Sequence, residues 1–177
     1  IPILQVDGFE ADDIIGTVAT QAGKKGIETY MLTPDKDYGQ LVRENVYMYR
    51  PQHGGGYEKL GVEEIEQKYG ISSPLQVIDL LALMGDSADN FPGCPGVGEK
   101  TAVKLINEFG SVEELIANSA KVKGKLREKV EAATEDIKMS KFLATIRTDV
   151  PVTQNLDDLK VVEPDKEKLD EIFTELE

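Results

Sequence analysis

The chain has 177 residues, of which 40% are hydrophobic and 30% charged, a composition that favours a folded domain over a disordered segment. No apolar run approaches the ~20 residues of a membrane span, and the single cysteine, Cys94, excludes an internal disulfide. With no visible signal peptide, we expect a cytoplasmic protein without a membrane partner. Because the chain opens on IPILQV without a Met and stops inside the helical pattern EIFTELE, we expect a fragment of a longer protein.

Strand and helix patterns alternate in the first third of the chain. The mainly apolar stretch ILQV at 3–6 predicts a strand, and apolar positions spaced by three and four predict a helix over residues 10–22. Further strands are predicted at 27–33 and 45–49, followed by a flexible, glycine-rich turn at 53–60. This order is typical of a parallel sheet with helices packed on it.

From about residue 61 the pattern becomes helical. Ser73 as N-cap with Gln76 predicts one helix start, and Ser111 with Glu114 predicts another. A short strand is predicted at 149–152 and a terminal helix near Pro164. The remaining predicted helices cover 62–70, 73–85, 99–110, 111–118 and 124–146. We therefore predict an α/β fold, with a partial parallel sheet and flanking helices over 1–60 and a helical region over 61–177.

The net charge of −13 argues against a nucleic-acid partner, but its distribution qualifies that conclusion. Residues 1–92 carry −8 and residues 131–177 carry −7, whereas residues 93–130 carry +2. The segment KVKGKLREK at 121–129 holds five positive charges and one negative. Such a run is also consistent with an ordinary solvated helix face.

Three carboxylate clusters lie at the ends of predicted helices and strands. One opens the first helix, one follows the second strand directly, and one follows the helix at 73–85. Their members are Glu10, Asp12 and Asp13; Asp35 and Asp37; and Asp86 and Asp89. Each cluster alone is consistent with helix capping or turn chemistry. Because the carboxyl ends of parallel strands form one crevice, we expect the clusters to converge on one edge of the sheet.

Converging carboxylates repel one another unless a cation lies between them. Hard oxygen ligands suit Mg²⁺ or Mn²⁺, whereas Cys94 and the single His53 cannot build a zinc site. An all-carboxylate site for two divalent ions about 3.5–4 Å apart is the arrangement used in phosphodiester hydrolysis. The acidic clusters therefore predict a two-metal hydrolytic site.

The glycine-rich stretch GCPGVGEKTAVKLI at 93–106 nearly matches a phosphate-binding P-loop. Glu99 stands where that loop requires Lys, and no strand precedes it, so an NTPase is disfavoured. A helix–hairpin–helix fits better, because glycines let the backbone approach a DNA phosphate and nearby lysines add charge. An ordinary helix–turn–helix connection is the alternative. The candidate DNA-binding residues are Gly96, Val97, Gly98, Lys100, Thr101 and Lys104.

Together these stretches resemble the 5′-nuclease domain of bacterial DNA polymerase I, in the flap-endonuclease superfamily. The resemblance rests on GFEADDIIG, LTPDKDYGQLV, LMGDSADNFPGCPGVGEKTA and, more loosely, KMSKFLATIRTDVPV. It implies two-metal cleavage of DNA near a 5′ end, removing flaps and RNA primers in replication and repair. It also implies K⁺ bound by backbone carbonyls around residues 93–98, and polymerase domains in the same full-length chain.

The resemblance places all seven carboxylates on the family's acidic positions. Asp12 is expected to be a shared ligand; Asp35, Asp37 and Asp89 serve the second ion; Glu10, Asp13 and Asp86 act through water. The family also has an N-terminal part with two further metal-binding Asp residues and a basic helical arch, none of which this sequence contains, so we expect the fragment to be inactive alone. The rivals are a non-catalytic helix–hairpin–helix DNA-binding module, whose acids are structural, and a ribonuclease of similar sheet topology.

Overall fold

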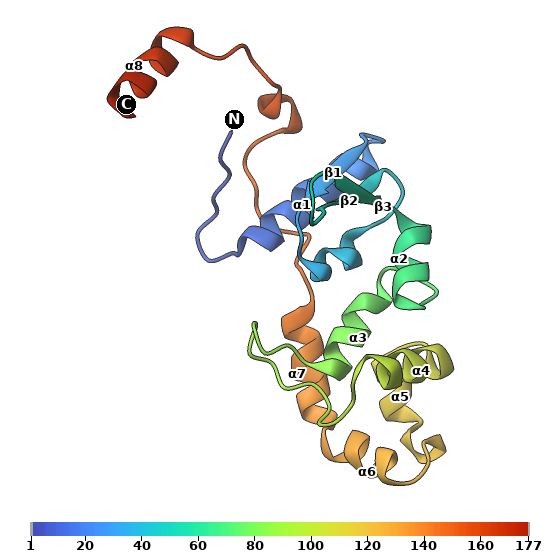
Figure 1. Cartoon of the computed structure of the whole chain (residues 1–177). Helices are drawn as coiled ribbons and strands as arrows, with labels where there is room; N and C mark the ends of the chain where they lie inside the picture. The colour runs from blue at the N-terminus through green and yellow to red at the C-terminus, as the bar shows by residue number, and fades with distance from the viewer. Residues whose placement is uncertain (1, 177) are drawn as a thin grey trace.

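The computed structural model describes residues 2–176 and contains a small sheet, a larger group of helices on one side of it, and a C-terminal helix that lies apart on the other side (Figure 1). The elements of the first part are α1 (Ala11–Lys24), β1 (Thr29–Leu32), the 3₁₀ helix η1 (Lys36–Leu41), β2 (Val46–Pro51) and β3 (Tyr57–Leu60). The strand order is β1-β2-β3. β1 pairs with β2 in parallel and β3 pairs with β2 antiparallel, so the sheet is mixed.

The two faces of the sheet differ because side chains alternate along each strand. Met31, Val46 and Met48 are buried in the same core as Ala19 of α1. The opposite face carries a tyrosine cluster, in which neighbouring ring centroids lie 4.7–5.7 Å apart and the ammonium of Lys59 lies 3.7 Å from the centre of the nearest ring. Its members are Tyr30, Tyr47, Tyr49 and Tyr57.

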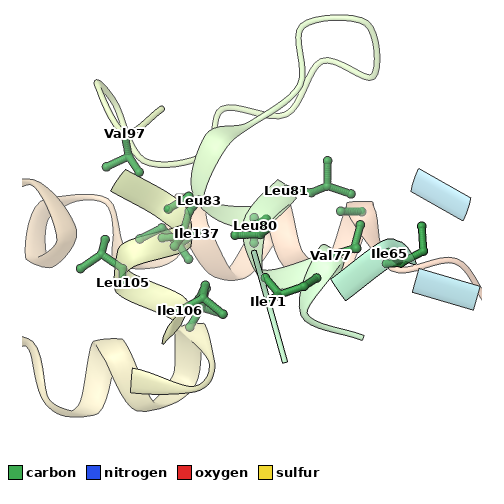
Figure 2. Close-up of a cluster of buried hydrophobic side chains, with 14 of the residues drawn as sticks. Ile65, Ile71, Val77, Leu80, Leu81, Leu83, Val97, Leu105, Ile106 and Ile137 are labelled. Carbon is green, nitrogen blue, oxygen red and sulfur yellow. The ribbon is translucent and has the colours of Figure 1, made fainter. Parts of the chain in front are cut away.

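The remaining elements are mostly helical. They are α2 (Val62–Tyr69), α3 (Gln76–Met84), α4 (Glu99–Phe109), α5 (Val112–Ala117), the 3₁₀ turn η2 (Ser119–Lys121), α6 (Lys125–Ala132), α7 (Thr134–Ala144), the 3₁₀ turn η3 (Leu156–Leu159) and α8 (Lys166–Leu176). α3 lies at the centre and packs against α7, α4 and η1. Figure 2 shows Leu80, Leu83 and Ile137 gathered in this core, which is continuous with the core under the sheet.

A partly buried ion pair ties α7 to α3. Asp79 of α3 is buried, and its Oδ1 accepts hydrogen bonds from Nζ of Lys141, at 2.7 Å, and from the backbone N–H of Val112, at 3.1 Å. Lys141 also pairs with Glu113. The neighbouring carboxylates raise the pKa of Lys141 against the opposing effect of burial. This pair fixes the direction of α7, whose last residues form a wall of the cleft described below.

The structure confirms the α/β fold class, the helix at 62–70 with Gly70 left-handed at its end, and the Ser111 cap, whose Oγ accepts from the N–H of Glu114. The predicted strand at 3–6 is wrong. In the described range, no strand pairs with the outer edge of β1, so residues 3–6 have no ladder to join. The predicted strand at 149–152 is wrong as well, because that segment lies across α1 without a neighbouring strand.

Two further predictions need correction. The turn at 53–60 is only partly a turn, because Tyr57–Leu60 returns to pair with β2 as β3. The helix predicted from Ser73 begins at Gln76, with Leu75 rather than Ser73 at its N-cap, and the side chain of Gln76 accepts from the N–H of Ser72 instead. No helix among residues 2–176 is long and apolar enough to cross a bilayer.

Candidate functional site

Members of all three acidic clusters line a cleft of about 590 Å³, which lies between the start of α1 and the end of α7. One wall carries acids from the start of α1, from η1 and from the loop after α3. The facing wall is the stretch 142–147, where α7 ends. The five acids that line the cleft are Glu10, Asp12, Asp13, Asp37 and Asp89.

The close approach of the 142–147 wall to α1 depends on Gly16. A β-carbon at Gly16 would lie 2.9 Å from Cγ2 of Ile146 and 3.1 Å from the carbonyl oxygen of Arg147. Glycine therefore lets this segment lie directly on α1. In that position the backbone N–H of Arg147 donates to Oδ1 of Asp13 at 2.8 Å.

The acids at the start of α1 are not simple caps. Glu10 is the N-cap residue, yet its side chain accepts no capping hydrogen bond. Asp12 instead accepts a hydrogen bond of 2.8 Å from the hydroxyl of Tyr38, which lies 26 residues away in the sequence. Burial raises the pKa of Tyr38, and the hydrogen bond to Asp12 raises it further. Asp12 and Asp13 are thus held by residues of other segments and face the cleft.

Asp37 is the most confined carboxylate of the site. Its side chain is buried, and its Oδ1 has no hydrogen-bond partner in the part of the chain that the structure describes. Burial, and then the nearby charge of Asp35, raise the pKa of Asp37 to about 6, with smaller contributions from Asp89 and Asp86 that Lys36 partly offsets. A buried carboxylate oxygen without a partner is uncommon in folded proteins, and a water, an ion or a ligand in the cleft would satisfy it.

Asp35 and Asp86 lie outside the lining of the cleft. Asp35 caps η1, where its Oδ1 accepts from the N–H of Asp37 at 3.0 Å. Asp86 pairs with the ammonium of Lys36 and accepts from the N–H of Ala88, and both contacts lower the pKa of Asp86. Five of the seven predicted acids therefore share the cleft, while two make local contacts beside it.

The carboxylates are also more widely spaced than a preformed metal site requires. Among residues 2–176, no three His, Cys, Asp or Glu side chains lie close enough together to hold a metal ion. The acids of the cleft are gathered by the fold but are not arranged as a complete ligand set.

The glycine-rich turn joins α3 to α4. Gly93 and Gly96 have positive φ angles of 61° and 75°, which favour glycine, and Gly98 is the N-cap of α4. Val97 is buried and its N–H donates to the carbonyl of Cys94, which closes the turn. On α4 the candidate Thr101 is half-buried, while Lys100 and Lys104 are exposed. The six predicted DNA-binding residues thus lie together on one turn and the first part of one helix.

Sequence reasoning missed three residues that shape these sites. Tyr38 and Arg147 hold Asp12 and Asp13, and the buried Ser140 of α7 accepts from the N–H of Gly93 at 2.9 Å, so that it fixes the start of the hairpin. All three lie inside stretches that carried the family resemblance, Tyr38 in LTPDKDYGQLV and both Ser140 and Arg147 in KMSKFLATIRTDVPV, and this was the available signal. No local pattern indicates the contact of Ser140 with Gly93, because the two residues lie 47 positions apart.

The chain matches two models of one protein family. Residues 1–70 match the model of the 5′-3′ exonuclease N-terminal resolvase-like domain, and residues 72–167 match that of the 5′-3′ exonuclease C-terminal SAM fold. The chain belongs to the 5′-3′ exonuclease family. Among the relatives of this 5′-3′ exonuclease chain, DNA polymerase I of Bacillus caldotenax is 43% identical over 99% of the chain, and the 5′-3′ exonuclease of Aquifex aeolicus is 39% identical over all of it.

The 5′-3′ exonuclease chain spans only part of these relatives, namely 20% of the Bacillus polymerase and 59% of the Aquifex exonuclease. Solved structures of bacteriophage T5 5′-exonuclease share its fold. One of a T5 5′-exonuclease mutant has a TM-score of 0.73 at 24% identity and covers 84% of this chain and 60% of that one. Another, described as having divalent metal ions (zinc) bound, has a TM-score of 0.74 and covers 84% and 54%.

Proposed function

We propose that this chain is the C-terminal portion of a structure-specific 5′-nuclease, a 5′-3′ exonuclease and 5′-flap endonuclease of the DNA polymerase I type. Its substrate is DNA with a 5′ flap, a nick or an RNA-primed end, and polymerase domains lie in the same full-length chain. The Bacillus relative supports this, because it is a DNA polymerase I of which the chain spans 20%. Within this proposal, residues 1–60 belong to the nuclease core and residues 61–177 form the helical DNA-binding region.

The observation that carries the proposal is the unpartnered, buried Oδ1 of Asp37 in a cleft with four other acids. A divalent cation beside this oxygen would satisfy it and would oppose both causes of the raised pKa of Asp37, which are burial and then the repulsion from Asp35. The donors are all hard oxygens, which suit Mg²⁺ or Mn²⁺. A T5 5′-exonuclease of the same fold is described with divalent metal ions (zinc) bound, which supports a divalent cation as a ligand of this fold.

We assign Asp12, Asp37 and Asp89 as direct ligands from within the cleft, and Asp35 as a further ligand once the acids close around an ion. Glu10, Asp13 and Asp86 act through water. The chemistry that two divalent ions supply when bound is easier ionisation of the attacking water and stabilisation of the leaving oxygen. The chain itself orients Asp12 through Tyr38 and Asp13 through the backbone of Arg147.

The hairpin positions the duplex relative to the cleft. The backbone amides of Gly96 and Gly98 and the ammonium groups of Lys100 and Lys104 contact phosphates, which sets position without reading base sequence. Backbone carbonyls around residues 93–98 hold K⁺ in this proposal, and DNA binding in KCl compared with NaCl at equal ionic strength tests that part separately.

The metal assignment is tested by calorimetric titration with Mn²⁺. We expect the parent chain to bind Mn²⁺, and Asp37→Asn/Asp89→Asn to bind it at least about tenfold more weakly, because each charged ligand contributes on the order of 1–2 kcal/mol. The matched control is Asp170→Asn/Glu171→Gln, which removes the same charge from α8, far along the chain. Equal binding by the parent and the cleft variant would refute the assignment.

The second candidate function is a DNA-binding module without catalysis. It is favoured by one observation, that no three potential ligands among residues 2–176 are close enough for a metal ion. Such a module binds duplex DNA equally with EDTA or Mg²⁺ and gives no heat with Mn²⁺, so the same titration separates the two functions.

A further inference from the structure

The segment 121–129 carries positive charge that the acidic cleft and the hairpin do not use. Lys121, Lys123, Lys125 and Lys129, here called the basic cluster, are all exposed. They lie on η2, on the loop after it and on α6, at the end of the molecule away from the sheet (Figure 1).

The charges of the basic cluster are not neutralised within the protein. No carboxylate oxygen among residues 2–176 lies within 4.0 Å of any of its four ammonium groups. Arg127, in the same segment, differs because its guanidinium pairs with Glu131 at 2.7 Å. The chain has 33 acidic residues and 20 basic ones, yet these four neighbouring lysines have no acidic partner. An anion from outside the protein would neutralise their charge.

The basic cluster also adjoins the hairpin. A cleft of about 240 Å³ separates α4 from the segment 121–126, and it is lined by Lys104 and Thr101 on one side and by Lys121 and Lys123 on the other. One acid, Glu108, lines the same cleft. At the turn itself, Nζ of Lys129 lies 2.5 Å from the position that a β-carbon at Gly96 would occupy. The lysines of the hairpin helix and those of the basic cluster therefore form one continuous surface.

We propose that the basic cluster is a second contact with the phosphate backbone of duplex DNA, which extends the footprint of the hairpin across α6. This inference rests on the proposed DNA-binding function. The net charge is +2 over residues 93–130, but −8 over residues 1–92 and −7 over residues 131–177. A polyanion such as DNA is therefore attracted to the segment 93–130 and repelled by the other two. Lysines act at phosphates as point charges, so the contact is independent of base sequence.

The test is the salt dependence of binding to a fluorescein-labelled DNA duplex, measured by fluorescence anisotropy in the presence of EDTA. Each phosphate contact contributes about −0.9 to the slope of log K against log[salt]. We expect Lys121→Ala/Lys123→Ala/Lys125→Ala to flatten the slope by about 2 to 3. If the parent and the variant bind equally at 1 M salt, a slope that is flatter by about 0.9 makes binding of the variant about eightfold weaker at 0.1 M salt. This factor applies to each phosphate contact that is removed.

The matched control is Lys160→Ala/Lys166→Ala/Lys168→Ala, which changes the net charge equally but lies in the exposed C-terminal segment. It should keep the parent slope. All six lysines are exposed, and unchanged thermal unfolding confirms that each variant is folded. A slope that falls equally in the control would show a general charge effect and overturn the proposal.

The hairpin variant Lys100→Ala/Lys104→Ala separates this inference from the proposed function. If the hairpin variant loses affinity and the basic-cluster variant does not, the second contact is overturned while the hairpin stands, and an acidic protein segment becomes the partner of these lysines. If only the basic-cluster variant loses affinity, the second contact is supported and the hairpin assignment fails. Weaker binding by both variants supports both.

Discussion

A single carboxyl group, that of Asp37, links the stability of the protein to its pH. Its pKa in the folded protein is about 6, above its ordinary value of 3.8. Below about pH 4 the group is protonated in both the folded and the unfolded states and has no effect. Between pH 4 and 6 the unfolded chain releases the proton more readily, so the free energy of unfolding falls as pH rises and stays lower above pH 6.

We therefore expect Asp37→Asn to raise the free energy of unfolding at pH 7.5 in EDTA, and to leave it nearly unchanged at pH 4. The gain should be about 1–3 kcal/mol, because ~3 kcal/mol is the most that the pKa difference allows. Urea denaturation followed by circular dichroism measures it, with Asp170→Asn as the control. An equal or lower stability of the variant at pH 7.5 would contradict the raised pKa.

At this scale the sequence identified the acids but not their individual environments. The residue types were visible in the sequence, as were their positions at the start of one helix, after one strand and after another helix, and these suffice to predict an acidic site. The partners of Asp12 and Asp13 come from 26 and 134 residues away, so no local pattern reveals them. Burial of Asp37 but not of Asp35, two positions earlier, likewise depends on tertiary packing.

The hairpin between α3 and α4 depends on one glycine more than on the others. Gly93 combines a positive φ of 61° with close packing, since a β-carbon there would lie 2.7 Å from Cα of Gly85. Gly54, in the turn between β2 and β3, has a φ of 100° and open space around it. Gly54→Ala therefore carries only the cost of the backbone conformation, whereas Gly93→Ala adds a collision with the backbone.

We expect Gly54→Ala to lower the free energy of unfolding by about 1–2 kcal/mol and Gly93→Ala by about 3 kcal/mol or more. Urea denaturation compares them. If Gly93→Ala yields no folded protein, Gly96→Ala provides the intermediate case, because its β-carbon meets only the mobile end of Lys129. Equal costs at positions 54 and 93 would show that the packing of the hairpin backbone is not limiting.

Among the elements, helices were easier to predict than strands. The helices α2, α4, α5 and α7 have apolar positions at helical spacing and end at clear signals such as Gly70 and Gly110. Strands need neighbours, which sequence periodicity does not report. The run at 3–6 is mainly apolar but unpaired, whereas Tyr57–Leu60 is short and follows three glycines but pairs fully with β2.

The spacing of the acids makes a prediction about the activity of the whole molecule. No three potential metal ligands are close enough within the described range, and the chain spans 59% of the Aquifex exonuclease. We expect this chain alone to cut a labelled 5′-flap substrate in Mg²⁺ at least about 10³-fold more slowly than a longer chain of the same protein. Ions and substrate held in imperfect positions raise the activation free energy, and ~4 kcal/mol corresponds to this factor.

Gel-resolved cleavage by three proteins tests this expectation. They are the chain of residues 1–177, a longer chain of the same protein, and that longer chain with Asp37→Asn, which should lose cleavage. Comparable rates for the first two proteins would show that the acids of the present cleft suffice. Undiminished cleavage by the third would remove Asp37 from the reaction.

The tyrosine cluster on the sheet has an optical consequence. The chain has no tryptophan, and its six tyrosines all lie between residues 30 and 69. Near-ultraviolet circular dichroism and intrinsic fluorescence therefore report on the sheet, on α2 and on the cleft, where Tyr38 touches Asp12, while the hairpin and the basic cluster contribute no tyrosine signal. The tyrosines thus allow a change at the acidic cleft to be followed without a label. DNA binding at the hairpin or at the basic cluster requires an added fluorophore.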